Sequence, residues 1–181
     1  MTSPDPLVSA PLVSAPLVIV MGVSGSGKSS VGLLLAKQLG VPFRDADDLH
    51  PAANVAKMAA GHPLTDADRW PWLARVGSEL AAAEPHGLVI ACSALKRSYR
   101  DAIRAVEPAV RFVHLSGSRD LLVSRMAGRE GHFMPLSLLD SQLATLEPLH
   151  PDEPGVTVSL DSLGSPEELA ADAKSALAAA P

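Results

Sequence analysis

The feature that constrains this chain most is a glycine-rich turn between a short apolar run and an amphipathic stretch. Residues 17–21 read LVIVM, an uninterrupted apolar run that is typical of a strand buried on both faces. Residues 22–29 read GVSGSGKS, which fits the pattern G-x-x-x-x-G-K-[ST], and residues 29–39 then place apolar side chains at helical spacing. This order of strand, turn and helix predicts a loop that binds phosphate groups through backbone N–H groups and a helix N-terminus.

Each part of the turn has a predicted role in holding a nucleoside triphosphate. The glycines let the backbone curl so that consecutive N–H groups point inward. The ammonium group of Lys28 can reach the β- and γ-phosphates, and the hydroxyl of Ser29 can bind Mg²⁺. The predicted nucleotide-binding residues of this loop are Gly22, Val23, Ser24, Gly25, Ser26, Gly27, Lys28, Ser29 and Ser30. The motif by itself does not distinguish a switch, a motor and a kinase.

Strand-like and helix-like segments alternate along the rest of the chain. Further strands are expected at residues 41–44, 88–92, 112–115 and 156–160. Helices are expected at about 51–60, 71–83, 97–106, 119–128 and 137–145, and after the N-cap Ser165. This alternation predicts an α/β fold of the P-loop NTPase type, with a five-stranded parallel sheet flanked by helices on both faces. The length of 181 residues suits a single domain, expected over residues 16–181.

The first fifteen residues are expected to lie outside this domain. Residues 6–10 and 11–15 both read PLVSA, and a proline at every fifth position forbids a helix. A period of five is also too short for a solenoid unit. We therefore expect residues 1–15 to form a disordered extension, with a partner-binding tail as the alternative.

Composition argues against several classes of protein. The formal net charge of −5 argues against a nucleic-acid binder that relies on a broad basic face. The single cysteine, Cys92, excludes an intramolecular disulfide and a multi-cysteine zinc site. No apolar run reaches the roughly 18 residues that span a bilayer, and the proline-interrupted N-terminal segment lacks the basic start of a secretory signal. A cytoplasmic protein with no nucleic-acid or membrane partner is expected.

A carboxylate is expected to face the bound triphosphate. The second expected strand ends in Asp45-Ala46-Asp47, and the carboxyl ends of strands line the ligand crevice of an open parallel sheet. Asp47 can orient an attacking hydroxyl or accept its proton. Because phosphoryl transfer has a loose transition state, orientation matters more than strong basicity. A helix N-cap or a solvated turn is the alternative interpretation of these aspartates.

The stretch from residue 47 to residue 73 reads DDLHPAANVAKMAAGHPLTDADRWPWL, and here the chain resembles the gluconokinase family. That family belongs to the shikimate-kinase-like group of P-loop small-molecule kinases. The matching residues are Asp47, Leu49, His50, Pro51, Asn54, Lys57, Met58, Gly61, Pro63, Leu64, Asp66, Asp68, Arg69, Pro71, Trp72 and Leu73. The chain departs from the family at Ala46, where glycine is usual. Residues 92–96 (CSALK), 131–134 (GHFM) and 142–147 (QLATLE) also resemble the family, so the likeness runs from about residue 20 to residue 148.

The resemblance implies ATP-dependent phosphorylation of D-gluconate to 6-phospho-D-gluconate, with ATP and Mg²⁺ as cofactors. It implies catalytic roles for Lys28, Asp47 and Arg125. Arg125 and Arg129 lie four residues apart, on one face of the helix that leads into a mobile lid at about 126–136, where they would reach the nucleotide phosphates. The implied substrate-binding residues are Asp47, His50, Arg69, Lys96, His132 and Gln142.

Alternatives stay open for single residues and for the whole chain. Ion pairing with Asp66 or Asp68 is the alternative role of Arg69, and loop hydrogen bonding is that of His50 and His132. The other functions are a shikimate-type kinase, a nucleotide-dependent switch that binds a protein, and a nucleic-acid end kinase. The family is commonly dimeric, and a homodimer is left open.

Overall fold

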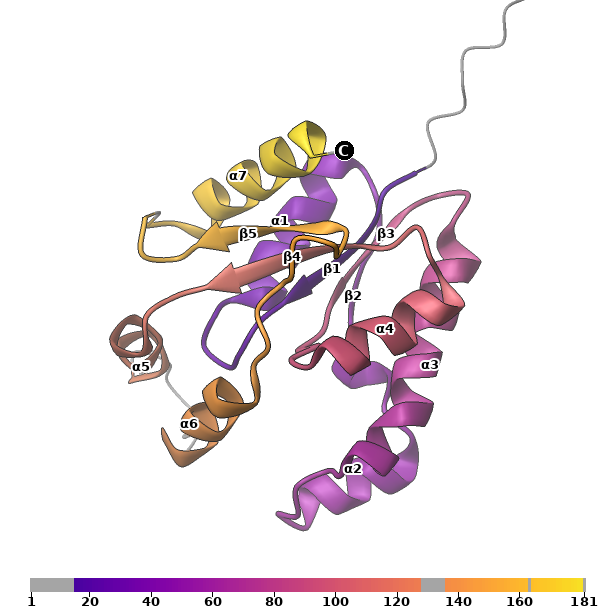
Figure 1. Cartoon of the computed structure of the whole chain (residues 1–181), viewed down its shortest axis with the longest axis vertical. Coiled ribbons are helices and arrows are strands. Elements are labelled where there is room, and N and C mark those ends of the chain that lie inside the picture. The colour runs from indigo at the N-terminus through magenta and orange to yellow at the C-terminus, as the bar shows by residue number, and fades with distance from the viewer. Residues whose placement is uncertain (1–14, 128–135, 163, 181) are drawn as a thin grey trace, which may run out of the picture.

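The computed structural model describes residues 15–127, 136–162 and 164–180, and their five strands form one parallel sheet between two layers of helices (Figure 1). The strands are β1 (Leu17–Met21), β2 (Phe43–Asp45), β3 (Leu88–Ala91), β4 (Arg111–Ser116) and β5 (Gly155–Ser159). Their order across the sheet is β2-β3-β1-β4-β5, so the strand that precedes the glycine-rich turn lies at the centre. The predicted five-stranded parallel α/β fold is confirmed.

The helices are divided between the two faces of the sheet and the edge to which its strands point. They are α1 (Lys28–Leu39), α2 (Ala52–Ala59), α3 (Asp66–Ala83), α4 (Arg97–Val106), α5 (Arg119–Ala127), α6 (Leu136–Thr145) and α7 (Pro166–Ala179), with a short 3₁₀ turn, η1 (Ala46–Leu49). Helices α1 and α7 pack together on one face, and α3 and α4 on the other. Helices α5 and α6 lie beyond the carboxyl ends of β4 and β1 (Figure 1).

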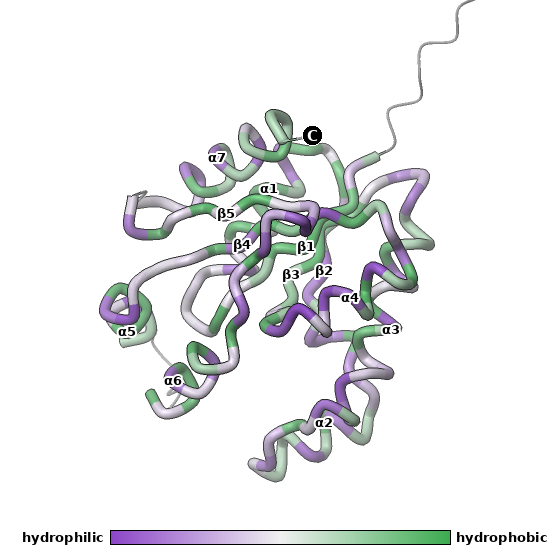
Figure 2. Tube along the Cα trace, viewed as in Figure 1, coloured by the Kyte–Doolittle hydropathy of each residue, from purple (hydrophilic) through white to green (hydrophobic). Residues whose placement is uncertain are grey.

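The core consists of two apolar clusters, one on each face of the sheet. Val18 and Val20 belong to the cluster shared with α1 and α7, while Ile19 and Met21 face α3 and α4. Successive side chains of a strand point to opposite faces, so a strand covered on both faces must be apolar throughout. The hydropathy colouring accordingly shows green at the centre of the sheet, and purple spread over the surrounding helices and connections (Figure 2).

Helix α3 begins earlier than the sequence pattern indicates. Its expected start at Pro71 is wrong, because a capping box begins the helix at Asp66. The Thr65 hydroxyl accepts from the N–H of Asp68 at 3.3 Å, and the Asp68 carboxylate accepts from the N–H of Thr65 at 2.7 Å. Pro71 then lies in the second turn, where it removes one helical hydrogen bond. The earlier start puts Asp66, Asp68 and Arg69 in the first turn.

Two predicted segments fall outside the part of the chain that the structure describes. These segments are residues 1–14 of the expected extension and residues 128–135 of the expected lid. Arg129 and His132 therefore also lie outside the described residues. Within the described ranges, no helix is both long and apolar enough to cross a membrane.

Candidate active site

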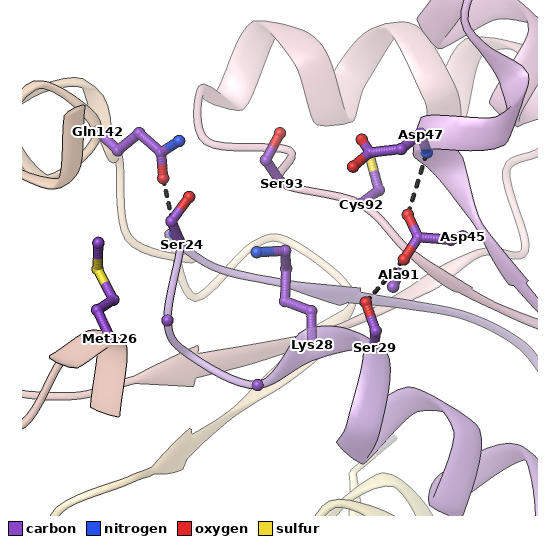
Figure 3. Close-up of a pocket in the computed structure, with 12 residues that line it drawn as sticks. Ser24, Lys28, Ser29, Asp45, Asp47, Ala91, Cys92, Ser93, Met126 and Gln142 are labelled. Atoms are coloured by element: carbon purple, nitrogen blue, oxygen red, sulfur yellow. Dashed lines mark hydrogen bonds between the residues drawn. The ribbon is translucent and has the colours of Figure 1, made fainter. Parts of the chain in front are cut away.

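A cavity of about 290 Å³ opens above the glycine-rich turn, at the carboxyl ends of the strands (Figure 3). Its walls come from the turn itself, the end of β2 and η1, the end of β3, and helices α5 and α6. Segments distant in sequence therefore meet at the edge where an open parallel sheet places its ligands.

The glycine-rich turn has the backbone conformation that a phosphate cradle needs. Gly25 has φ +81°, and a Cβ there would lie 2.8 Å from Cγ of Met126, so any other residue would be strained and would displace Met126. Gly27 adopts the left-handed conformation immediately before α1. The ammonium of Lys28 donates to the carbonyl of Val23 at 3.0 Å and points into the cavity (Figure 3). The turn thus combines a curled backbone, a helix N-terminus and a cation.

Asp45 contacts the turn directly, a contact that the sequence pattern did not predict. Its Oδ2 accepts from the hydroxyl of Ser29 at 2.7 Å, and its Oδ1 accepts from the N–H of Asp47 at 3.1 Å. The second bond caps η1, so the N-cap interpretation is confirmed for Asp45. The spacing of Asp45 and Asp47, two residues apart at the end of β2, was the sequence signal from which a second carboxylate at this site could have been predicted. Hydroxyl and carboxylate oxygens are the ligands that Mg²⁺ prefers, so Ser29 and Asp45 fit that ion.

Asp47 lines the same cavity from the side of β2, opposite the turn (Figure 3). It lies on η1, which Trp72 holds in place by donating from Nε1 to the carbonyl of Ala46 at 2.7 Å. Partial desolvation, followed by repulsion from Asp45, raises the pKa of Asp47, although its side chain is 87% exposed to solvent. A carboxylate with a raised pKa accepts a proton more readily than an ordinary aspartate.

His50 lies behind Asp47 and does not line the cavity. Its side chain is only 5% exposed and stacks on Trp72, with ring centroids 4.3 Å apart and planes 13° apart. Its Nε2 lies 4.0 Å from Oδ1 of Asp47. In this conformation His50 supports the turn that carries Asp47, and its predicted contact with substrate stays a prediction.

Two cations predicted to bind substrate meet around one carboxylate. Asp66 accepts from Nζ of Lys96 at 2.8 Å and from the hydroxyl of Tyr99 at 2.5 Å, and it lies 3.8 Å from Nη1 of Arg69. The Tyr99 ring also faces both cations, with centroid distances of 5.3 Å to Lys96 and 5.7 Å to Arg69. The alternative expected for Arg69, an ion pair with Asp66, is therefore present.

Gln142 joins α6 to the glycine-rich turn. Its Oε1 accepts from the N–H of Ser24 at 2.6 Å. The Nε2 group, which has two hydrogens to donate, points away from the turn (Figure 3). The family resemblance implies that Gln142 binds substrate, which stays a prediction; the structure places Gln142 on the cavity wall next to the turn.

A second pocket of about 260 Å³ lies on the far side of the turn. Arg125 of α5 and Pro166 of α7 line it, together with Gly27 and Ser30. Neither Arg125 nor Ser30 lines the first cavity, so their predicted contacts with the nucleotide stay predictions.

Buried Cys92 also borders the first cavity. Burial raises the pKa of its thiol to about 12, so the thiol stays protonated. Cys92 is therefore a packing residue and no nucleophile. No group of three His, Cys, Asp or Glu side chains that could hold a metal ion occurs among the residues described.

Comparisons with known proteins agree with this geometry. A family model described as an AAA domain matches residues 17–149. The gluconokinase of Gluconobacter oxydans (strain 621H) is 54% identical over 143 residues, which cover 78% of this chain and 80% of that protein. The crystal structure of a gluconokinase from Sinorhizobium meliloti 1021 is 48% identical, with a TM-score of 0.82, covering 91% of this chain and 93% of that chain. A shikimate kinase from Bacteroides thetaiotaomicron, at 17% identity, a TM-score of 0.64 and coverage of 90% and 98%, shares the fold alone.

Proposed function

The chain belongs to the gluconokinase family, and on this premise we propose that its cavity transfers the γ-phosphoryl group of ATP to the 6-hydroxyl of D-gluconate. The products are ADP and 6-phospho-D-gluconate. The observation that carries the proposal is that the Lys28 ammonium and the Asp47 carboxylate line one cavity. A cation for the phosphates and a carboxylate for the acceptor are the two groups that this transfer requires.

The glycine-rich turn is the site for the triphosphate. Its N–H groups and Lys28 bind the β- and γ-phosphates and neutralise charge that develops on the transferred group. Mg²⁺ would be held by Ser29, next to Asp45, and would supply positive charge to the phosphate oxygens. The pocket between Arg125 and Pro166 suits the adenine ring, because a guanidinium stacks on aromatic planes. Arg129 is proposed to reach the phosphates from the lid.

Asp47 is proposed to orient the acceptor hydroxyl and to take its proton. The oxygen of the hydroxyl forms a bond to the γ-phosphorus while the bond from that phosphorus to the ADP oxygen breaks. The proton of the hydroxyl passes to the carboxylate. Exclusion of water by the lid would limit hydrolysis of ATP.

The carboxylate end of gluconate is proposed to bind Arg69 and Lys96. These two cations and Asp66 together carry one net positive charge, which complements one substrate carboxylate. The Nε2 group of Gln142 is proposed to donate to a substrate hydroxyl, and His132 is proposed to contact substrate from the lid.

The function is tested by measuring ADP release with ATP and a panel of sugar acids, shikimate and a short oligonucleotide. We expect release to require gluconate and phosphorus NMR to place the phosphate on carbon 6. ADP release with shikimate but not with gluconate would favour a shikimate-type kinase. Slow ADP release at a rate that no acceptor changes would favour a switch. A homodimer and a cytoplasmic location stay predictions.

A further inference from the structure

A row of polar side chains behind Asp47 has no role in the mechanism above. Asn54 is 5% exposed and lies between the carbonyl of Asp68 and the ring of His50. The ring of His50 in turn lies between Asn54 and Asp47. Buried polar groups in a row restrict one another, because each hydrogen bond needs one donor and one acceptor.

The orientation of the Asn54 amide follows from its backbone partner. The Asp68 carbonyl oxygen can only accept, so the amide group 2.8 Å from it is the NH₂ group. One hydrogen of Nδ2 is used there. The other is available to Nδ1 of His50, at 3.4 Å.

The proton of His50 is therefore placed on its other nitrogen. An NH₂ group has no lone pair to accept with, so Nδ1 of His50 must be the unprotonated nitrogen of a neutral ring. Burial, followed by the charge of Arg69, lowers the pKa of His50, which keeps the ring neutral near pH 7 although Asp47 acts in the opposite direction. The hydrogen is then carried by Nε2.

Nε2 is the ring nitrogen of His50 that lies near the carboxylate of Asp47. Stacking on Trp72 fixes the plane of the ring, and the bond from Trp72 to Ala46 fixes the turn that carries Asp47. The distance of 4.0 Å from Nε2 to Oδ1 exceeds a hydrogen bond, as is common for catalytic pairs before substrate binds.

We propose that His50 is a positioning residue, whose Nε2–H tautomer, imposed by Asn54, orients the Asp47 carboxylate toward the acceptor hydroxyl. This inference rests on the proposed role of Asp47 in phosphoryl transfer. No proton passes to or from His50. The role differs from a substrate contact, because it acts on the rate of transfer and leaves gluconate binding unchanged.

The tautomer can be measured without any assay of activity. A long-range proton–nitrogen NMR correlation at neutral pH distinguishes the two neutral forms, and loss of the signal in His50→Gln assigns it. We expect the Nε2–H form. A ring protonated on Nδ1, or a charged ring, would overturn the proposal even if the enzyme phosphorylates gluconate.

The kinetic test compares two amides at one position. In His50→Gln the amide nitrogen takes the place of Nε2, whereas in His50→Asn it takes the place of Nδ1. We expect His50→Gln to keep kcat within about fivefold and His50→Asn to lower it about 10–100-fold, because a small misplacement of a catalytic group has an effect of this order. The KM values for gluconate and ATP should stay within about twofold in both.

Exposed His62, in the connection between α2 and α3, provides the matched control, and His62→Asn should leave kcat unchanged. Circular dichroism checks that each variant is folded. Equal kcat values for the Gln and Asn variants, or a raised KM for gluconate at unchanged kcat, would overturn the proposal. A wild-type enzyme inactive on gluconate would contradict the proposed function, while the NMR measurement would still decide how His50 is oriented.

Discussion

Mild acid is expected to destabilise the protein through His114, in the middle of β4. The residue is only 2% exposed, between β1 and β5, and neither ring nitrogen has a hydrogen-bond partner among the described residues. Burial, followed by the positive charge of Arg100, lowers the pKa of His114 from 6.5 to about 4. The folded protein therefore keeps this ring neutral at a pH where the unfolded chain binds a proton.

The size of the effect follows from the two pKa values. The depressed pKa contributes stability that is fully present above pH 6.5 and is lost as the pH falls toward 4. Linkage with pKa values of 6.5 and 4 gives a loss of about 2 kcal/mol at pH 5 and about 3 kcal/mol at pH 4. A typical domain is stable by only about 5–15 kcal/mol, so the loss is large enough to measure.

The assay is urea unfolding at pH 7.5 and pH 5 for the wild type, His114→Leu and His114→Gln. Neither variant can titrate at this position. From pH 7.5 to pH 5, the free energy of unfolding of each variant should therefore fall by about 2 kcal/mol less than that of the wild type. His114→Leu also removes two unpartnered nitrogens, and it should be at least as stable as the wild type at pH 7.5. Exposed His86 is the control, and His86→Gln should follow the wild type.

The comparison between proteins isolates His114 from other acid-sensitive groups. Paired carboxylates also lose stability in acid, but they are the same in the wild type and in the variants. If His114→Leu and the wild type lost equal stability between pH 7.5 and pH 5, the reasoning would be refuted.

Three further predictions concern catalysis, substrate binding and folding. Asp47→Asn should lower kcat at least about 100-fold in the ADP-release assay and leave the unfolding midpoint unchanged, because it removes the group that orients the hydroxyl. Near wild-type turnover would remove Asp47 from the mechanism. Lys96→Met should raise the KM for gluconate about 10-fold or more and leave the KM for ATP unchanged, since Lys96 does not line the cavity above the glycine-rich turn. A raised KM for ATP at an unchanged KM for gluconate would assign Lys96 to the nucleotide. Arg100→Met leaves the fully buried Glu153 carboxylate without the guanidinium 2.6 Å away, and it should lower the free energy of unfolding, measured in urea, by about 3–5 kcal/mol. A loss below about 1 kcal/mol would show that the pair contributes little.

Much of the fold was predictable because it depends on local patterns. The apolar run before Gly22, the turn and the helical spacing after it each lie within a dozen residues. The cap formed by Ser165 and Glu168 was visible for the same reason. The start of α3 was missed because its capping box uses an aspartate, Asp68, in place of the usual Glu or Gln, while Pro71 resembled a helix start.

The site was less predictable where its contacts join distant parts of the chain. Asp45 was visible next to Asp47, but its bond to Ser29, sixteen residues away, depends on how β2 and η1 are placed relative to α1. Nothing in the sequence indicated that Asp66 contacts Lys96 and Tyr99, which follow it by about thirty residues.

Short-range order along the chain was enough to indicate the strands, most of the helices, the phosphate-binding turn and the candidate roles of Lys28 and Asp47. Such features depend on spacing within one or two turns of helix or strand, which the sequence states directly. Packing of distant elements settled which groups are buried and which charges act on them, as for His50 next to Asp47 and for His114 under the influence of the Arg100 charge. Burial and charge act through space, and one sequence pattern is compatible with several such arrangements.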